Sequence, residues 1–171
     1  ITCLPLGGGK SVISGDSRKS KTPDMMTAMG RAVESFSGSY IVAEDVGTTV
    51  EDMNNIHTQT QSVVGIAHDG QGSGDPSPTT AYGVFVGLKA AVRTRLGRDD
   101  LKGVKVAVQG LGNVGYNLCK LLAAEGAQLW VTDVDQDRVN QVVSEFGATA
   151  VGLNDIYSQD VDVFAPCALG A

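Results

Sequence analysis

The sequence predicts an α/β protein whose second half forms a parallel, doubly wound sheet. From residue 104 onward, short apolar segments typical of buried strands alternate with segments that repeat apolar residues at helical spacing. This alternation indicates parallel strands joined by helices. A turn-rich stretch with almost no apolar side chains, residues 67–78, separates this half from the first. We therefore expect two domains, residues 1–74 and residues 75–171.

The first domain is expected to be part of an α/β domain. Residues 11–14 read as a short strand and residues 40–43 as a buried strand. Glu44 and Asp45 follow the second strand directly, at the end where α/β sheets place their ligands. A solvated pair of loop carboxylates is the alternative interpretation of these two residues.

Two helices are predicted in this domain. Thr22 is suited to cap the first, with Pro23 at the first helical position and Gly38 as its end. Thr49 with Asp52 three residues later resembles a capping box and begins the second. The apolar face of the first helix would be formed by Met26, Met29, Val33 and Phe36. Its methionines, with Met25, are interpreted as core filler and not as a cofactor pocket.

The second domain begins with a long helix. Ser77 can cap this helix, which would start at Pro78. Its buried face would consist of Ala81, Val84, Leu88, Val92 and Leu96. The following elements are expected as strand 104–109, helix 113–125, strand 129–132, helix 136–146, a strand near Ala150 and a strand over 161–165.

Composition narrows the class of function. A chain of 171 residues with 42% hydrophobic residues can bury a core, and a net charge of −6 disfavours a nucleic-acid or anionic-membrane partner. No segment approaches the ~20 apolar residues of a membrane span, so we expect a soluble, cytoplasmic protein acting on a small molecule. Cys3, Cys119 and Cys167 are widely spaced, which predicts neither a disulfide framework nor a metal site. Because the chain opens on Ile1 and stops directly after an apolar run, we expect a piece of a longer protein.

A glycine-rich turn carries the strongest chemical signal. It joins a predicted strand to a predicted helix and has the form G-x-G-x-x-G, which lets a backbone approach a pyrophosphate at a helix N-terminus. Its residues are Gly110, Leu111, Gly112, Asn113, Val114 and Gly115. The pattern alone is weak in a chain with 22 glycines, and glycines that only permit close packing are the alternative. The context of strand, turn and helix favours a site for NAD.

Asp133 specifies the cofactor further. It ends the next strand, 18 residues after Gly115, near the position where a carboxylate holds the adenosine ribose hydroxyls. Its charge would repel the 2′-phosphate of NADP, and no arginine adjoins it. NAD is therefore preferred, although Arg138, one helical turn further on, leaves residual use of NADP open.

A second glycine cluster, Gly7-Gly8-Gly9-Lys10-Ser11, resembles the end of a phosphate-binding loop. That motif requires a glycine at position 4, which is Leu4, so a nucleotide hydrolase is disfavoured. Glycines still admit a substrate close to the main chain, and a partly desolvated lysine can act as a base. A surface turn with a solvated lysine is the alternative.

Four segments together resemble the glutamate, leucine, phenylalanine and valine dehydrogenase family along the whole chain. They are residues 4–10 (LPLGGGK), 43–49 (AEDVGTT), 74–83 (GDPSPTTAYG) and 165–171 (APCALGA). Leucine-specific members look the most similar, notably through residues 107–110, 116–119 and 155–160. The resemblance implies a partial substrate and oligomerisation domain followed by a Rossmann-like NAD-binding domain. It also implies a homo-oligomer, an octamer in the leucine-specific members.

The activity implied by the resemblance is NAD-dependent, reversible oxidative deamination of a branched-chain L-amino acid, with leucine favoured. Lys10 matches the lysine that polarises the developing carbonyl and activates water, and Asp45 matches the carboxylate that exchanges a proton with the substrate nitrogen. The alternatives are the same reaction on valine, phenylalanine or tryptophan, or a non-catalytic NAD-binding module. The family's carboxylate-binding lysine has no counterpart between Ile1 and Ala171.

The resemblance also assigns binding residues. Gly7 and Gly8 would lie against the substrate, and Thr80 would bind the nicotinamide carboxamide. Cys167 and Ala168 would line the nicotinamide pocket through contact, without nucleophilic attack by the thiol. The cofactor would otherwise be held by the glycine-rich turn, by Tyr116 directly after it and by Asp133.

Overall fold

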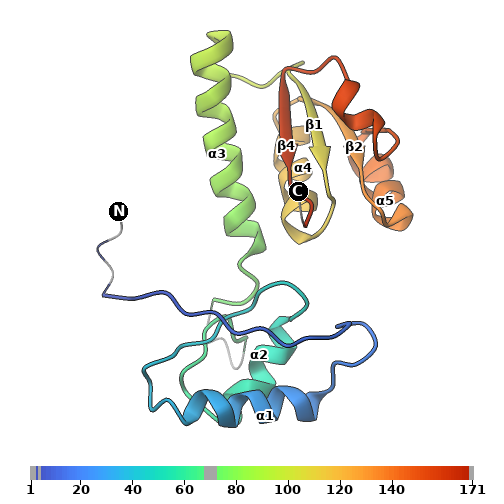
Figure 1. Ribbon diagram of the computed structural model, residues 1–171. Helices are drawn as coiled ribbons and strands as arrows, with labels where there is room; N and C mark the ends of the chain where they lie inside the picture. Colours follow the sequence, from blue (N-terminus) through green and yellow to red (C-terminus); the bar gives the residue numbers. More distant parts are fainter. Residues whose placement is uncertain (1–2, 4, 68–72, 170–171) are drawn as a thin grey trace. The chain divides into compact units, whose positions relative to one another are not determined.

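The computed structural model describes residues 3, 5–67 and 73–169 (Figure 1). Its chain divides into two compact units, residues 1–76 and residues 77–171. Leu4, on which the phosphate-loop comparison depends, lies outside the described residues, as do His68 in the turn-rich stretch and the last two residues of the 165–171 motif.

Unit 1 is built on two helices, α1 (Pro23–Glu34) and α2 (Val50–His57) (Figure 1). Both predicted caps are present. The Thr22 hydroxyl accepts the Met25 N–H at 3.2 Å, and Thr49 and Asp52 form a reciprocal capping box. The helices close over a small core of Met26, Val33, Val42, Met53, Ile56 and Val63.

The strands expected in unit 1 are not formed. Val42 makes an isolated parallel bridge with Val63, and residues 11–14 are exposed and extended without ladder pairing. A strand exists only where a neighbour supplies backbone partners, and the described residues give the segment 11–14 none. An apolar pattern alone is therefore not sufficient for a strand.

Helix α1 ends earlier than predicted. Its last residue is Glu34, and turn bonds spaced by three residues, Phe36 N–H to Val33 and Ser37 N–H to Glu34, replace the helical bonds. The chain turns away through Ser37 (φ 50°) before reaching Gly38 (φ 84°). Phe36 is consequently 57% exposed and does not belong to the buried face.

Unit 2 is a parallel sheet with helices, as predicted. Its elements are α3 (Ser77–Leu96), β1 (Lys105–Gln109), α4 (Asn113–Ala124), β2 (Gln128–Thr132), α5 (Gln136–Phe146), β3 (Thr149–Ala150), η1 (Asp155–Ser158) and β4 (Val163–Pro166). The strand order is β3-β2-β1-β4, with every pairing parallel (Figure 1). The chain moves outward from β1 to β3 and then returns to place β4 on the other side of β1. This reversal is the switch point at which doubly wound sheets bind ligands.

The core of unit 2 surrounds β1 and α4. Val106, Ala107 and Val108 of β1 are fully buried, and Leu118 and Leu122 of α4 pack in the same cluster. Strand β1 therefore reads as an apolar run because both faces of a parallel sheet are covered.

Helix α3 contributes a buried face that differs from the predicted one. Ala81, Phe85, Leu88 and Val92 are buried, whereas Val84 and Leu96 are each 40% exposed. At 3.6 residues per turn, the four buried positions fall within an arc of about 60°, and Val84 and Leu96 lie outside its edges. Phe85 takes the place expected for Val84. The prediction failed at Val84 because a step of three residues from Ala81 turns back by about 60°, and at Leu96 because repeated steps of four drift forward by about 40° each.

The core makes a stability prediction. Leu118→Ala removes a fully buried side chain and should lower the free energy of unfolding by about 2–5 kcal/mol, because a cavity remains among the side chains of β1 and α4. Leu153→Ala, at a side chain that is 50% exposed, is the matched control and should change it by about 0.5 kcal/mol or less. Urea unfolding followed by circular dichroism measures both. Equal losses would contradict the assigned core.

Candidate functional site

The two residues expected to be catalytic meet in unit 1. The Lys10 ammonium forms an ion pair with Asp45 Oδ2, although the residues come from separate extended segments. Their side chains are 67% and 56% exposed, so both groups remain open to a ligand. Asp45 Oδ1 accepts the Val46 N–H at 2.8 Å, which fixes the orientation of the carboxylate. The pairing places a cation and an anion side by side at one accessible point.

A tight turn presents Asp45. The Thr48 hydroxyl accepts the Asp45 N–H at 2.9 Å and lies 2.7 Å from the Asp45 carbonyl oxygen, to which it donates. The Thr48 N–H donates to the same carbonyl at 3.0 Å. Gly47 has a φ of 82°, a left-handed conformation that favours glycine. The AEDVGTT segment thus folds into a turn that closes on the backbone of Asp45.

Glu44 behaves differently from its neighbour. Its Oε2 atom is buried and has no hydrogen-bond partner within the described residues. Burial raises the pKa of this carboxyl group above its usual value, the nearby Asp75 and Asp52 raise it further, and Lys21 acts in the opposite direction. The alternative of a solvated loop pair is therefore wrong for Glu44, whereas Asp45 lies in the open and faces a cation.

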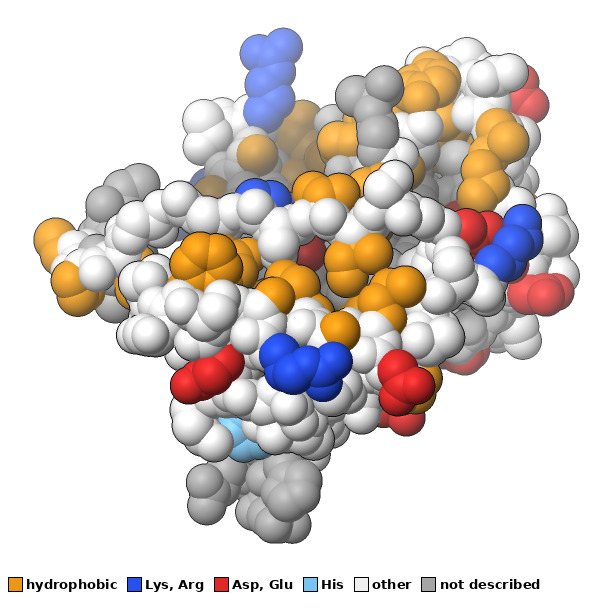
Figure 2. All heavy atoms as spheres, turned by 60° about the horizontal axis from the view of Figure 1, so that its bottom comes forward, with side chains coloured by type: hydrophobic (Ala, Val, Ile, Leu, Met, Phe, Trp, Pro, Cys, Tyr) orange, Lys and Arg blue, Asp and Glu red, His pale blue; other side chains and the backbone are white. Residues whose placement is uncertain are grey.

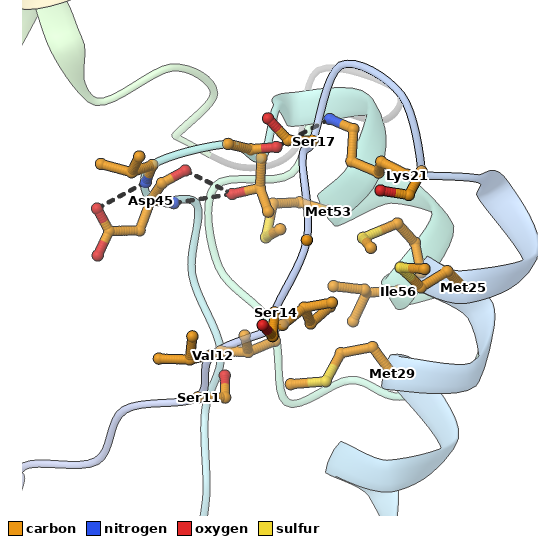
Figure 3. A pocket seen from close by; sticks show the side chains of 18 of the residues that line it. Ser11, Val12, Ser14, Ser17, Lys21, Met25, Met29, Asp45, Met53 and Ile56 are labelled. Atoms are coloured by element: carbon orange, nitrogen blue, oxygen red, sulfur yellow. Dashed lines mark hydrogen bonds between the residues drawn. The ribbon is translucent and has the colours of Figure 1, made fainter.

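A cavity of about 490 Å³ lies beside the Lys10–Asp45 pair, within unit 1. Hydrophobic side chains gather on the face of unit 1 that Figure 2 brings forward. Figure 3 shows Met25, Met29 and Ile56 directed from the two helices toward the segment that carries Val12 and Ser14, and Met53 also lines this cavity. Met25, Met26 and Met29 all line the cavity; Met26 is buried in the core, and Met25 and Met29 are half-buried and pack against that core. Their interpretation as core filler is therefore incomplete.

The first glycine cluster divides into open and packed positions. Nothing lies within 4 Å of the point where a Cβ atom would stand on Gly7 or Gly8. A Cβ on Gly9 would stand 2.9 Å from the Tyr40 ring. The Tyr40 hydroxyl in turn lies 2.9 Å from the Ser11 hydroxyl. Tyr40 thus anchors the segment that leads to Lys10, a role that the apolar pattern of residues 40–43 did not indicate.

The second glycine cluster forms a turn at the end of β1. Gly110 has a φ of 92°, and its N–H donates to the Thr132 carbonyl at 2.8 Å. Gly112 is the N-cap of α4, and because glycine has no side chain, it leaves the first N–H groups of that helix without a side-chain acceptor. Gly115 lies so close to the Gly110 carbonyl that a Cβ atom would collide with it. The turn can therefore offer backbone donors to an anion.

Asp133 adjoins this turn, as the spacing predicts. Its Oδ2 atom accepts the Leu111 N–H at 2.5 Å, and its Oδ1 atom accepts the Asp135 N–H at 2.8 Å. The Arg138 Nε atom lies 3.5 Å from Asp135 Oδ2, and Arg138 Nη1 comes within 3.4 Å of the point where a Gly112 Cβ would stand. Arg138 is thus nearer to the turn than sequence spacing suggested.

Cys167 and Ala168 reach the same turn from β4. The Cys167 N–H donates to the Gln109 carbonyl at 2.7 Å, and the Ala168 N atom lies 2.5 Å from the point where a Gly110 Cβ would stand. Burial raises the pKa of the Cys167 thiol, which disfavours the thiolate and agrees with a contact role. Thr80 lies exposed in the first turn of α3.

Tyr116 is engaged within the protein. Its N–H donates to the Gly112 carbonyl at 2.9 Å, and its hydroxyl donates to Glu145 Oε2 at 2.6 Å. This hydrogen bond raises the pKa of Tyr116 and lowers that of Glu145. The residue therefore joins α4 to α5, and both polar groups that it could offer a cofactor already have partners.

No helix in residues 3, 5–67 and 73–169 combines the length and the apolar character needed to cross a bilayer. The same residues contain no group of three or more His, Cys, Asp or Glu side chains placed to hold a metal ion.

Comparisons with known proteins identify the class. The family profile described as the Glu/Leu/Phe/Val dehydrogenase dimerisation domain matches residues 1–62, and the Glutamate/Leucine/Phenylalanine/Valine dehydrogenase profile matches residues 70–137. The two matches fall on the two units that carry the Lys10–Asp45 pair and the glycine-rich turn. The chain therefore belongs to the glutamate, leucine, phenylalanine and valine dehydrogenase family.

Individual members of the family show which of its enzymes this chain resembles. The leucine dehydrogenase of Bacillus subtilis is 56% identical over 98% of the chain, and the leucine dehydrogenase of Geobacillus stearothermophilus is 55% identical. The crystal structure of L-tryptophan dehydrogenase from Nostoc punctiforme has a TM-score of 0.68 at 47% identity, covering 98% of this chain and 47% of that one. The chain spans about half the length of its curated relatives, 46% of the Bacillus subtilis protein.

The packing of the glycine-rich turn makes a second stability prediction. Gly115→Ala should lower the free energy of unfolding by about 1–3 kcal/mol or more, because the added methyl group meets the Gly110 carbonyl, which is backbone and cannot rotate away. Gly87→Ala, in α3 with nothing within 4 Å, is the control and should raise it by up to about 1 kcal/mol. Thermal unfolding of both variants is the measurement. A neutral Gly115→Ala would refute the close approach.

Proposed function

We propose that this chain carries the catalytic and cofactor-binding segments of an NAD-dependent L-amino-acid dehydrogenase that converts leucine reversibly to its 2-oxo acid and ammonia. The observation that carries the proposal is the exposed Lys10–Asp45 ion pair, in a chain 56% identical to a leucine dehydrogenase. Oxidative deamination needs a cation beside a developing carbonyl oxygen and a carboxylate beside the substrate nitrogen, and this pair offers both.

Each residue of the pair has a distinct task in the proposed reaction. Asp45 accepts a proton from the substrate ammonium group, so that the free amine forms. Lys10, as the free amine, takes a proton from the water that adds to the imine carbon, and the ammonium group so formed stabilises the oxygen that gains charge. Lys10 and Asp45 face each other before substrate arrives, and their exposure lets a substrate ammonium group compete for the carboxylate.

The cofactor would be held by residues of unit 2. When bound, NAD accepts the hydride from the substrate α-carbon. The Gly110–Gly115 turn supports a pyrophosphate through the uncapped N–H groups at the start of α4. Asp133 keeps spare acceptor capacity for ribose hydroxyls, since each of its oxygens accepts one backbone N–H and a carboxylate oxygen can accept more than one. Thr80, Cys167 and Ala168 are proposed for the nicotinamide by family resemblance.

NAD is proposed over NADP because Asp133 places a negative charge at the end of β2, where a 2′-phosphate would be repelled. Arg138 lies near the turn, but Asp135 is its partner in an ion pair. We also propose, from the dimerisation-domain match and the family resemblance, a cytoplasmic homo-oligomer, octameric as in the leucine-specific members.

We propose leucine as the substrate because this chain is more similar in sequence to leucine dehydrogenases than to the tryptophan and phenylalanine dehydrogenases that it also matches. An L-tryptophan dehydrogenase of Nostoc punctiforme is 49% identical to this chain, and a phenylalanine dehydrogenase of Bacillus thermotolerans is 41% identical. Valine, phenylalanine and tryptophan are therefore the alternative substrates, and a non-catalytic NAD-binding module is the alternative class.

The direct test is NADH formation at 340 nm by the full-length protein that contains this chain. Separate wells receive L-leucine, L-valine, L-isoleucine, L-phenylalanine, L-tryptophan and L-glutamate with NAD, and a parallel set receives NADP. We expect the largest rate with leucine and NAD. An aromatic preference would replace the substrate and keep the reaction, and no NADH in any well would favour the binding module.

The role of Lys10 makes a separate prediction. In the full-length protein, Lys10→Ala should lower kcat by about 10²–10⁴-fold, because the residue acts on the charge that develops in the reaction. NAD binding, measured by isothermal titration calorimetry, should remain. Lys19→Ala is the control, since Lys19 pairs with Asp16 at 3.2 Å on the surface and is 83% exposed. Wild-type turnover in Lys10→Ala would remove this residue from the mechanism.

A further inference from the structure

Besides the Lys10–Asp45 ion pair, a second lysine of unit 1, Lys21, contacts the turn that presents Asp45. The hydrogen bonds within the turn join Asp45 to Val46 and Thr48 and define its shape only. Lys21 reaches it from 26 residues earlier in the chain: its Nζ atom donates to the Gly47 carbonyl at 3.1 Å. In Figure 3 the Lys21 side chain runs toward this turn from the start of α1.

Lys21 is itself held from the other side. Its Nζ atom lies 2.5 Å from Asp52 Oδ2, in an ion pair whose side chains are only 22% and 9% exposed. Asp52 cannot move freely, because the same Oδ2 atom accepts the Thr49 N–H at 2.8 Å and the Thr49 hydroxyl at 3.0 Å in the cap of α2. The ammonium therefore connects the turn to a carboxylate that α2 has already fixed.

The placement of a cation here is not explained by helix α1. Lys21 directly precedes the N-cap Thr22, where the helix dipole disfavours positive charge. The carboxylates around it do explain it: Asp52 is its partner, and Glu44 is close enough for Lys21 to oppose the rise of its pKa. A lysine at this position is therefore favoured by its contacts with these carboxylates and with the Gly47 carbonyl, and not by the helix.

We infer that Lys21 is a positioning residue for Asp45: its ammonium ties the Gly47 carbonyl to the buried Asp52 carboxylate and so holds the Asp45 side chain opposite Lys10. This inference rests on the proposed function, because it concerns the residue proposed to exchange a proton with the substrate. The lysine does not touch the reacting groups. Its effect is on where the carboxylate stands, and a displacement of about 1 Å can cost on the order of 10²-fold in rate.

The test uses the full-length protein with Lys21→Met, which keeps the length of the side chain and removes its charge and donors. We expect kcat with leucine to fall by up to about 10²-fold, with the KM for NAD unchanged. Hydrogen exchange should accelerate at the amides of residues 45–49 and stay as in the wild type in α4. Lys21→Arg, which keeps the charge, should recover most of kcat. Lys19→Met, at an exposed surface pair, should match the wild type in every measurement.

Several results would overturn the inference. Wild-type kcat and wild-type exchange at residues 45–49 in a folded Lys21→Met would remove the positioning role. Equal acceleration of exchange throughout unit 1, with kcat retained below the melting temperature, would show a structural role alone. If Lys21→Met fails to fold, Lys21→Gln, which keeps a donor for the Gly47 carbonyl, decides the matter by the same measurements. Failure of both to fold would make the lysine a general stabilising residue.

The exchange measurement separates this inference from the proposed function. A wild-type protein that oxidises no amino acid would refute the function, while exchange at residues 45–49 would still report whether Lys21 orders the turn. A wild-type protein that is active, with no effect of Lys21→Met on kcat or exchange, would refute the inference alone.

Discussion

The parallel pairing of β1 with a strand on each side is the constraint on which unit 2 depends. Its register aligns Gln109 with Thr132 of β2 and with Pro166 of β4, so the three strands end at the same level. The residues that follow, Gly110, Asp133 and Cys167, must then gather at one edge of the sheet. Residues widely separated in sequence become neighbours because a ladder of backbone hydrogen bonds fixes the register.

In unit 1 the residues of the site are positioned by contacts other than a sheet. Its described residues contain one isolated bridge and no extended ladder, so the segments around Lys10 and Asp45 are placed by caps, side-chain hydrogen bonds and ion pairs. Each of these contacts holds its segment with few others beside it. The loss of one partner therefore displaces a segment of unit 1 more than the loss of one hydrogen bond displaces a strand, which is held by many. The partly buried Lys21–Asp52 pair is therefore expected to contribute more to stability than an exposed pair such as Lys19–Asp16.

Much of this arrangement could be predicted from the sequence, for identifiable reasons. The caps at Thr22 and Thr49 are local chemistry, and the alternation of strands and helices after residue 104 is a strong periodic signal. Spacing placed Asp133 at the end of a strand for a role toward ribose hydroxyls, which stays a prediction, while its hydrogen bond to the Leu111 N–H was not predicted. The expected strands of unit 1 were wrong because pairing is not local, and the Lys21 contacts were missed because they join positions 26 and 31 residues apart.

The burial of the Cys119 and Cys167 thiols affects the charge at the edge of the sheet where Gly110 and Cys167 meet. Burial, with a smaller contribution from Cys167, raises the pKa of Cys119 to about 12, and burial also raises that of Cys167. Both sulfur atoms consequently stay protonated at neutral pH, and no thiolate adds negative charge beside the N–H groups at the start of α4. The positive end of that helix dipole is thus left uncancelled by sulfur, and both cysteines are poor targets for oxidants that require a thiolate.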